Sequence, residues 1–176
     1  LRRADRDVAA DALWALAVAD RAAFEQLNRV HRERSRMAPA AQARLALAWL
    51  AAGRRTLAAE LRAGLVTALQ TGVAKGGGAG VETRALALQG LLQLEPRSSQ
   101  VRAGLDGLRT ARVGSGWGTP EATLAAVTAL LQADRQPGAP AAPGEVVVTV
   151  NGQLAATLDG AAVLAAEPIQ VPPGLL

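Results

Sequence analysis

The residues most suggestive of a binding site in this chain are those of the stretch GSGWGTPEAT, at 114–123. A glycine-rich loop that cradles phosphate normally follows a strand and opens a helix, whereas a helical pattern precedes this one. Thr119 suits a helix N-cap and Pro120 suits a first helical turn, where its missing N–H costs nothing. We therefore predict a tight structural corner filled by Trp117, with a ligand cradle as the alternative. The predicted corner and cap consist of Gly114, Gly116, Trp117, Gly118, Thr119 and Pro120.

The remaining candidates for catalysis are few. The chain has one histidine, His31, and no cysteine. His31 follows Leu27 by four residues, so we expect it to pack at the apolar edge of a helix. One histidine without cysteine does not make a typical zinc site. The segment TGVAKGGGAG, at 71–80, lacks the preceding strand and the Gly-Lys-Ser/Thr ending of a phosphate loop and is predicted to be a flexible loop. We therefore expect no catalytic residue, no metal site and no cofactor, and hence no enzyme.

The charged residues show one basic cluster in a chain whose formal net charge is only +4. Glu33 lies among the arginines, and a mixed run of this kind is typical of a solvated helix end. A contact patch for an anionic partner is the alternative. Nucleic-acid partners are not expected, because aromatic residues make up 2% of the chain and the basic excess is mild. The cluster consists of Arg29, Arg32, Arg34 and Arg36.

The elements that must position these residues are predominantly helices. Hydrophobic residues make up 50% of the chain and are mostly Ala, Leu and Val, so small side chains must form the core. Helices that are apolar on most sides are predicted to alternate with amphipathic helices, and this pattern favours an inner layer wrapped by an outer one. The expected architecture over 1–134 is thus a double-layered α/α array, curved into a toroid or stacked as a solenoid. The inner helices are predicted at 7–20, 39–52, 81–96 and 119–134, and the outer helices at 21–34, 54–70 and 98–112.

The composition changes after the last helix. A Pro/Gly/Ala-rich linker is predicted at 135–144. A β-hairpin with its turn at Asn151-Gly152 is predicted at 145–158 and a further strand within 162–176, so that 145–176 begins a β-sandwich domain. The longest apolar stretches are far shorter than the roughly 18 residues that span a bilayer, so no membrane insertion of this segment is expected.

Several segments, taken in order, resemble the thioester-containing domain of the alpha-2-macroglobulin and complement family, especially its bacterial members. Trp117, Gly118 and Thr123 match a Trp-Gly-Ser-Thr-Gln-x-Thr turn of that domain, and Thr119-Pro120-Glu121 replace its Ser-Thr-Gln. The order of these segments along the chain carries the resemblance. The other similar segments are the helical patterns at 10–30, 44–65 and 82–96 and the β segment at 146–160.

The resemblance implies the later helices of an α/α toroid followed by the start of a β-sandwich domain. It implies a non-catalytic part of a bacterial, host-defence type endopeptidase inhibitor whose full-length form traps proteases. The family's Cys-x-Glu-Gln thioester motif does not occur in this sequence. Further implications are neighbouring β-sandwich domains as partners and a periplasmic location, with a lipid anchor on the protein's N-terminus. A helical-repeat protein-binding module and a toroid prenyl or terpene enzyme are the alternatives, and the enzyme would need an acidic centre or zinc.

Overall fold

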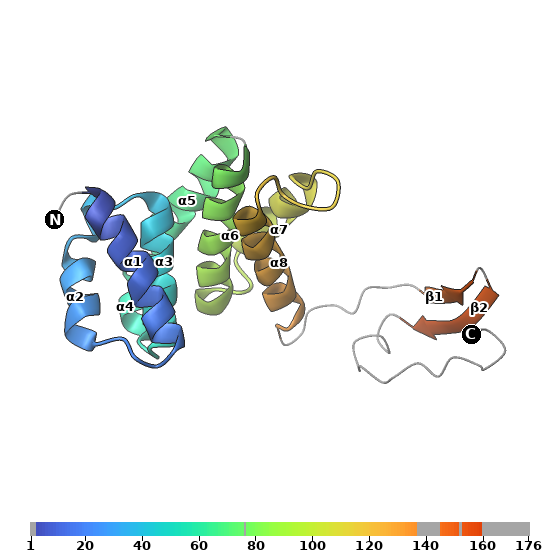
Figure 1. Cartoon of the computed structure of the whole chain (residues 1–176), viewed down its shortest axis with the longest axis horizontal. Coiled ribbons are helices and arrows are strands. Elements are labelled where there is room, and N and C mark those ends of the chain that lie inside the picture. Colours follow the sequence, from blue (N-terminus) through green and yellow to red (C-terminus); the bar gives the residue numbers. More distant parts are fainter. Residues whose placement is uncertain (1–2, 76, 137–144, 152, 160–176) are drawn as a thin grey trace. The chain divides into compact units, whose positions relative to one another are not determined.

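The computed structural model describes residues 3–75, 77–136, 145–151 and 153–159 (Figure 1). The chain divides into a helical unit that ends at Gln136 and a second unit that begins at Pro137 and contains both strands. The protein is thus mainly helical, as its Ala- and Leu-rich composition predicts.

Four helices of the helical unit form a row in which each packs against the next. α1 packs against α3, α3 against α6 and α6 against α8. The other helices lie against this row: α2 contacts α1 and α3, α4 and α5 contact α3 and α6, and α7 contacts α6 and α8. The row and its covering helices therefore alternate along the chain. The row comprises α1 (Arg3–Val18), α3 (Pro39–Ala51), α6 (Gly77–Leu94) and α8 (Pro120–Asp134), and the covering elements are α2 (Phe24–Arg32), the 3₁₀ turn η1 (Arg34–Arg36), α4 (Arg55–Ala59), α5 (Arg62–Lys75) and α7 (Ser99–Thr110).

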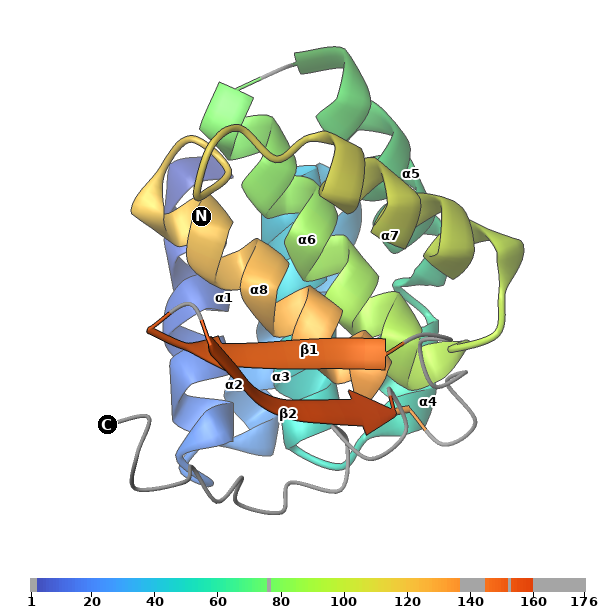
Figure 2. The ribbon, with the colours of Figure 1, turned by 90° about the vertical axis from the view of Figure 1, so that its right-hand side faces the viewer.

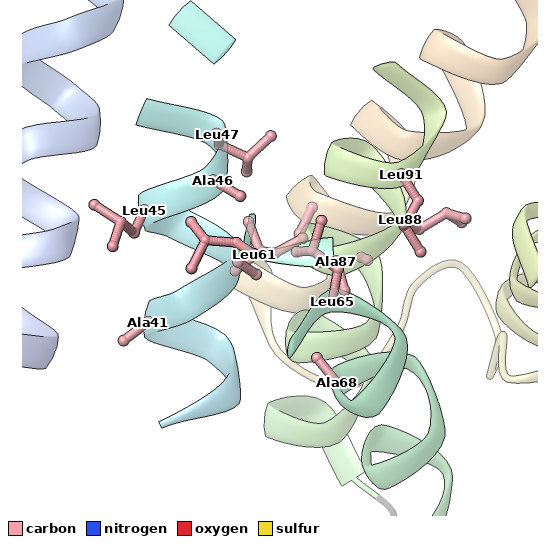
Figure 3. Close-up of a cluster of buried hydrophobic side chains, with 14 of the residues drawn as sticks. Ala41, Leu45, Ala46, Leu47, Leu61, Leu65, Ala68, Ala87, Leu88 and Leu91 are labelled. Atoms are coloured by element: carbon pink, nitrogen blue, oxygen red, sulfur yellow. The ribbon is translucent and has the colours of Figure 1, made fainter. Parts of the chain in front are cut away.

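The two central helices of the row, α3 and α6, are enclosed on nearly all sides. Five consecutive residues of α3, from Leu45 to Trp49, are buried, and so is every residue of α6 from 84 to 92. Figure 3 shows leucine and alanine side chains of α3, α5 and α6 meeting in one cluster. Each fully buried leucine contributes roughly 1.5–3 kcal/mol, so this cluster stabilises the unit substantially.

The two end helices of the row, in contrast, are buried on one side only. Val8 and Leu16 of α1 are exposed, as are Leu124 and Leu131 of α8. The sequence predicts that these helices are enclosed like α3 and α6, and for the isolated chain that prediction is wrong. The physical reason is their position, because each end helix has a neighbour in the row on one side alone.

Two boundaries also differ from the prediction. Within the expected loop at 71–80, residues 71–75 and 77–80 are helical, since α5 continues to Lys75 and α6 begins at Gly77. Close packing accounts for glycine there, because a Cβ at Gly78 would lie 2.5 Å from Thr119 Cγ2 and Gly80 is buried. The predicted helix at 54–70 is broken between Ala59 and Arg62 into α4 and α5.

The second unit contains a two-stranded antiparallel hairpin, β1 (Glu145–Val150) and β2 (Gln153–Asp159). Val150 pairs with Gln153, so two residues form the turn, and Asn151 has the positive φ of 52° that such turns favour. The predicted hairpin is therefore confirmed. Residues 137–144 of the predicted linker and the predicted strand within 162–176 lie outside the described residues.

Candidate functional site

The glycine-rich corner lies between α7 and α8 and begins with a tight turn. Val113 and Gly116 exchange two backbone hydrogen bonds, of 2.9 and 3.2 Å, across Gly114 and Ser115. Gly114 and Gly118 have φ values of +60° and +93°, which favour glycine because other residues meet steric strain there. A Cβ at Gly116 would lie 2.8 Å from Thr123 Oγ1. The backbone conformation therefore favours glycine at positions 114 and 118, and the lack of space for a side chain favours it at position 116.

Trp117 fills this corner and is 7% exposed. Its Nε1–H donates to the backbone oxygen of Leu108 at 2.7 Å, and its backbone N–H donates to Thr123 Oγ1 at 3.0 Å. The Arg112 guanidinium lies over the indole, 6.0 Å from the ring centroid. Trp117 therefore joins the last turn of α7 to the first turn of α8, and both its indole N–H and its backbone N–H are occupied within the protein.

The first turn of α8, directly after the corner, has the cap that the sequence predicts. Thr119 is the N-cap of α8, and its Oγ1 accepts a hydrogen bond from the Ala122 N–H at 3.2 Å. Pro120 occupies the first turn, and Glu121 places a carboxylate at the positive end of the helix dipole. The arrangement stabilises a sharp chain reversal and offers no donor cradle comparable to a phosphate loop.

The four arginines of the predicted basic patch have two different environments. Arg29 and Arg32 are exposed on α2, and Arg36 is exposed on η1. Arg34 is half-buried and donates to the His31 backbone oxygen at 3.1 Å and to Glu60 Oε2 at 3.3 Å. Arg34 therefore stabilises the fold, whereas Arg29, Arg32 and Arg36 remain exposed.

His31 belongs to a partly buried network that residue types and spacing do not predict. The Trp49 Nε1–H donates to His31 Nδ1 at 3.0 Å. Indole nitrogen is a donor only, so Nδ1 is the acceptor and the ring hydrogen is on Nε2, which donates to Glu60 Oε2 at 3.1 Å. Both ring nitrogens are occupied, so the arrangement fixes α2 against α3 and against the end of α4, and it leaves no ring nitrogen for a substrate. The break between α4 and α5 places Glu60 there, and no local pattern signals that break.

A second network joins three helices of the row. Arg44 of α3 pairs with Asp11 of α1 at 2.8 Å and with Glu82 of α6 at 2.5 Å. Burial raises the pKa of the Asp11 carboxyl above its ordinary value, and the nearby Asp7 adds to this rise, whereas the Arg44 charge acts against it. Deeper in the row, the Gln89 side chain of α6 donates to the Ala125 backbone oxygen of α8 at 2.9 Å. These polar contacts fix the spacing of neighbouring helices, because alanine-rich surfaces alone specify their alignment weakly.

Within the described part of the chain, no three His, Cys, Asp or Glu side chains come together as a metal site would require. The described helices also include none whose length and apolar character would allow it to cross a bilayer. Comparison of the chain with protein-family models, with curated proteins and with solved structures finds no match.

Proposed function

We propose that this chain is the later part of the α/α toroid domain of a bacterial alpha-2-macroglobulin-like endopeptidase inhibitor and acts there as a non-catalytic scaffold. The observation that carries the proposal is the alternation of row helices and covering helices, in the order that the sequence resemblance implies. The corner at Trp117 and the cap at Thr119 stand where the resembling turn begins the last inner helix.

The exposed apolar faces at the two ends of the row support the same proposal. Leu124 is 70% exposed, and Val127 and Leu131 lie on the same face of α8. Val8 and Leu16 form a similar stripe on α1, at the opposite end of the row. Exposed leucine and valine stripes on helices are typical of surfaces that another helix covers. In a closed toroid, further row helices of the same domain would cover both.

The proposal assigns the full-length protein to the bacterial cell envelope. There it would be periplasmic, with a lipid anchor on its N-terminus, and proteases would be its targets. The chain would contribute rigidity and contacts to neighbouring β-sandwich domains of the same protein. Covalent capture would depend on a Cys-x-Glu-Gln segment elsewhere in that protein.

One substitution tests whether α8 is covered in the full-length protein. Leu124→Glu adds a charge at an exposed site of the isolated chain, so its melting temperature should change little. In the full-length protein the same charge would be buried without a partner and should destabilise this domain strongly. Arg102→Glu is the matched control, because Arg102 is exposed on the covering helix α7 and should be tolerated in both proteins. Equal tolerance of Leu124→Glu in both proteins would refute the closed array.

Protease trapping is tested with the full-length protein and trypsin. A trapped protease retains activity on a small chromogenic peptide and loses activity on a large substrate such as casein. Parallel loss of both activities, or loss of neither, would refute the trapping function.

A helical-repeat protein-binding module is the second candidate, and the exposed trio Arg29, Arg32 and Arg36 favours it. Reversing all three charges to Glu would abolish binding to an acidic partner protein under this alternative. Trapping by the full-length protein would be unaffected under the scaffold proposal, so the two candidates predict different outcomes for one variant.

A further inference from the structure

A groove between α5 and α7 contains a buried charge that the described structure leaves without a counter-charge. The cavity measures about 240 Å³. Val66, Leu69 and Gln70 of α5 form one wall, Gly104 and Gly107 of α7 belong to the other, and Arg84 of α6 also lines the cavity. Figure 2 shows α5, α6 and α7 lying next to one another at this part of the helical unit.

Arg84 is 8% exposed, and its Nε has no hydrogen-bond partner among the described residues. Burial lowers the pKa of its guanidinium from the ordinary value, with no carboxylate acting against that shift. Arg6, which is also buried among the described residues, has a different environment, because it pairs with Glu33 at 3.1 Å. A buried charge without a partner is costly, so proteins normally pair such groups or use them to bind a ligand.

Two glycines of α7 allow side chains of α6 to approach that helix closely. A Cβ at Gly107 would lie 3.0 Å from Arg84 Nη1, and a Cβ at Gly104 would lie 3.0 Å from Leu88 Cδ1. Glycine in a helix interior costs about 1 kcal/mol relative to alanine, so both positions lower helix stability but let Arg84 and Leu88 pack closely against α7.

We propose that this groove binds a small carboxylate carried on an apolar group, with Arg84 as the anion-binding residue. The guanidinium presents a planar fork of N–H donors that matches a carboxylate. Val66 and Leu69 supply an apolar wall for the rest of the ligand. An apolar cavity of about 150 Å³ holds benzene, so the groove has room for an acid of the size of benzoate. This binding site is independent of the scaffold function proposed above.

Benzoate is the probe that tests the proposal, with benzamide as its neutral counterpart of the same shape. Titration with benzoate, followed by backbone amide NMR, should give saturable shifts confined to residues 66–70, 84 and 100–107. Benzamide should bind at least about tenfold more weakly, because it lacks the charge that Arg84 would neutralise. The melting temperature should also rise with benzoate concentration, since the ligand binds only the folded chain.

Three variants connect the binding to this groove. Arg84→Met retains a long apolar stem and removes the charge, so benzoate binding should be lost while the melting temperature is maintained or raised. Gly107→Leu fills the groove without altering any charge, and it should also abolish binding. Arg102→Met removes an exposed arginine from α7, the helix that contains Gly107, and should leave binding unchanged. The proposal is overturned if benzoate gives no saturable shifts, if benzamide binds equally well, or if binding survives in Arg84→Met or Gly107→Leu.

Discussion

Replacing Trp117 with alanine should destabilise the helical unit more than any exposed aromatic substitution. The indole is almost fully buried between α7 and α8, and its N–H satisfies the Leu108 carbonyl at 2.7 Å. Trp117→Ala removes that packing and leaves the carbonyl without its donor. It also removes the ring beneath Arg112, whose guanidinium then loses its cation–π contact.

The magnitude follows from the burial of the ring. Truncation of a buried tryptophan to alanine costs about 3–5 kcal/mol. For a unit of this size, each kcal/mol corresponds to about 3–5 °C in melting temperature, so we expect a fall of about 15 °C. Trp117→Phe retains an aromatic ring but loses the N–H donor and some volume, and it should cost about 2 kcal/mol.

Thermal unfolding followed by circular dichroism at 222 nm measures these effects, and urea unfolding gives the corresponding free energies. Phe24→Ala is the matched control, because Phe24 is half-exposed at the start of α2 and should cost about 1 kcal/mol through its edge contact with Trp49. A melting temperature of Trp117→Ala equal to that of Phe24→Ala would refute the corner as a structural element and would favour a ligand-binding surface there.

Three further substitutions test other features of the helical unit. Gly118→Ala should lower the free energy of unfolding by about 1–3 kcal/mol in urea titrations, because φ is +93° and the added methyl group would lie 3.4 Å from the Gly78 backbone; an unchanged value would show that the corner relaxes freely. Asp20→Gly should raise that free energy by about 1 kcal/mol, because Asp20 lies two residues beyond α1 with a φ of 56°, and a loss of stability would show that its side chain has a role of its own. The hydrogen bond from Arg62 lowers the pKa of Glu95 below 4.5, so the stability from this pair is present above that pH and is lost as the pH falls through the lowered pKa. Glu95→Gln should therefore make stability less dependent on pH below about 4.5, and an unchanged dependence would show that the pair contributes nothing.

Local signals in the sequence predict the start of α8, the end of α3 and the hairpin well. Thr119 and Pro120 mark the start of α8, and Gly53 follows the end of α3 with a φ of +71°. Arg54 and Gly53 donate backward to Trp49 and Leu50 with the two hydrogen bonds of a Schellman motif. These features depend on a few adjacent residues, so the sequence contains the information that specifies them.

Features that depend on contacts distant in the sequence are predicted poorly. Glycine propensity alone predicts a loop at 71–80, but packing of Gly78 against Thr119 favours a helical start there. Residue types likewise do not reveal that His31, Trp49 and Glu60 meet, because Glu60 reaches the site only through the break between α4 and α5. The charge of Arg84 in an apolar groove is also invisible in the linear pattern, where Arg84 resembles a surface residue of a helix's first turns.

The one-sided burial of α1 and α8 has a consequence for how the helical unit opens. Each end helix detaches by breaking contacts on a single face, whereas α3 or α6 separates only when the whole hydrophobic cluster is disrupted. Among the four helices of the row, amide hydrogen exchange should accordingly be fastest in α1 and α8 and slowest in α3 and α6. The free energies of subglobal opening should rise towards the middle of the row. Covering either end helix would raise its opening free energy towards that of the central pair.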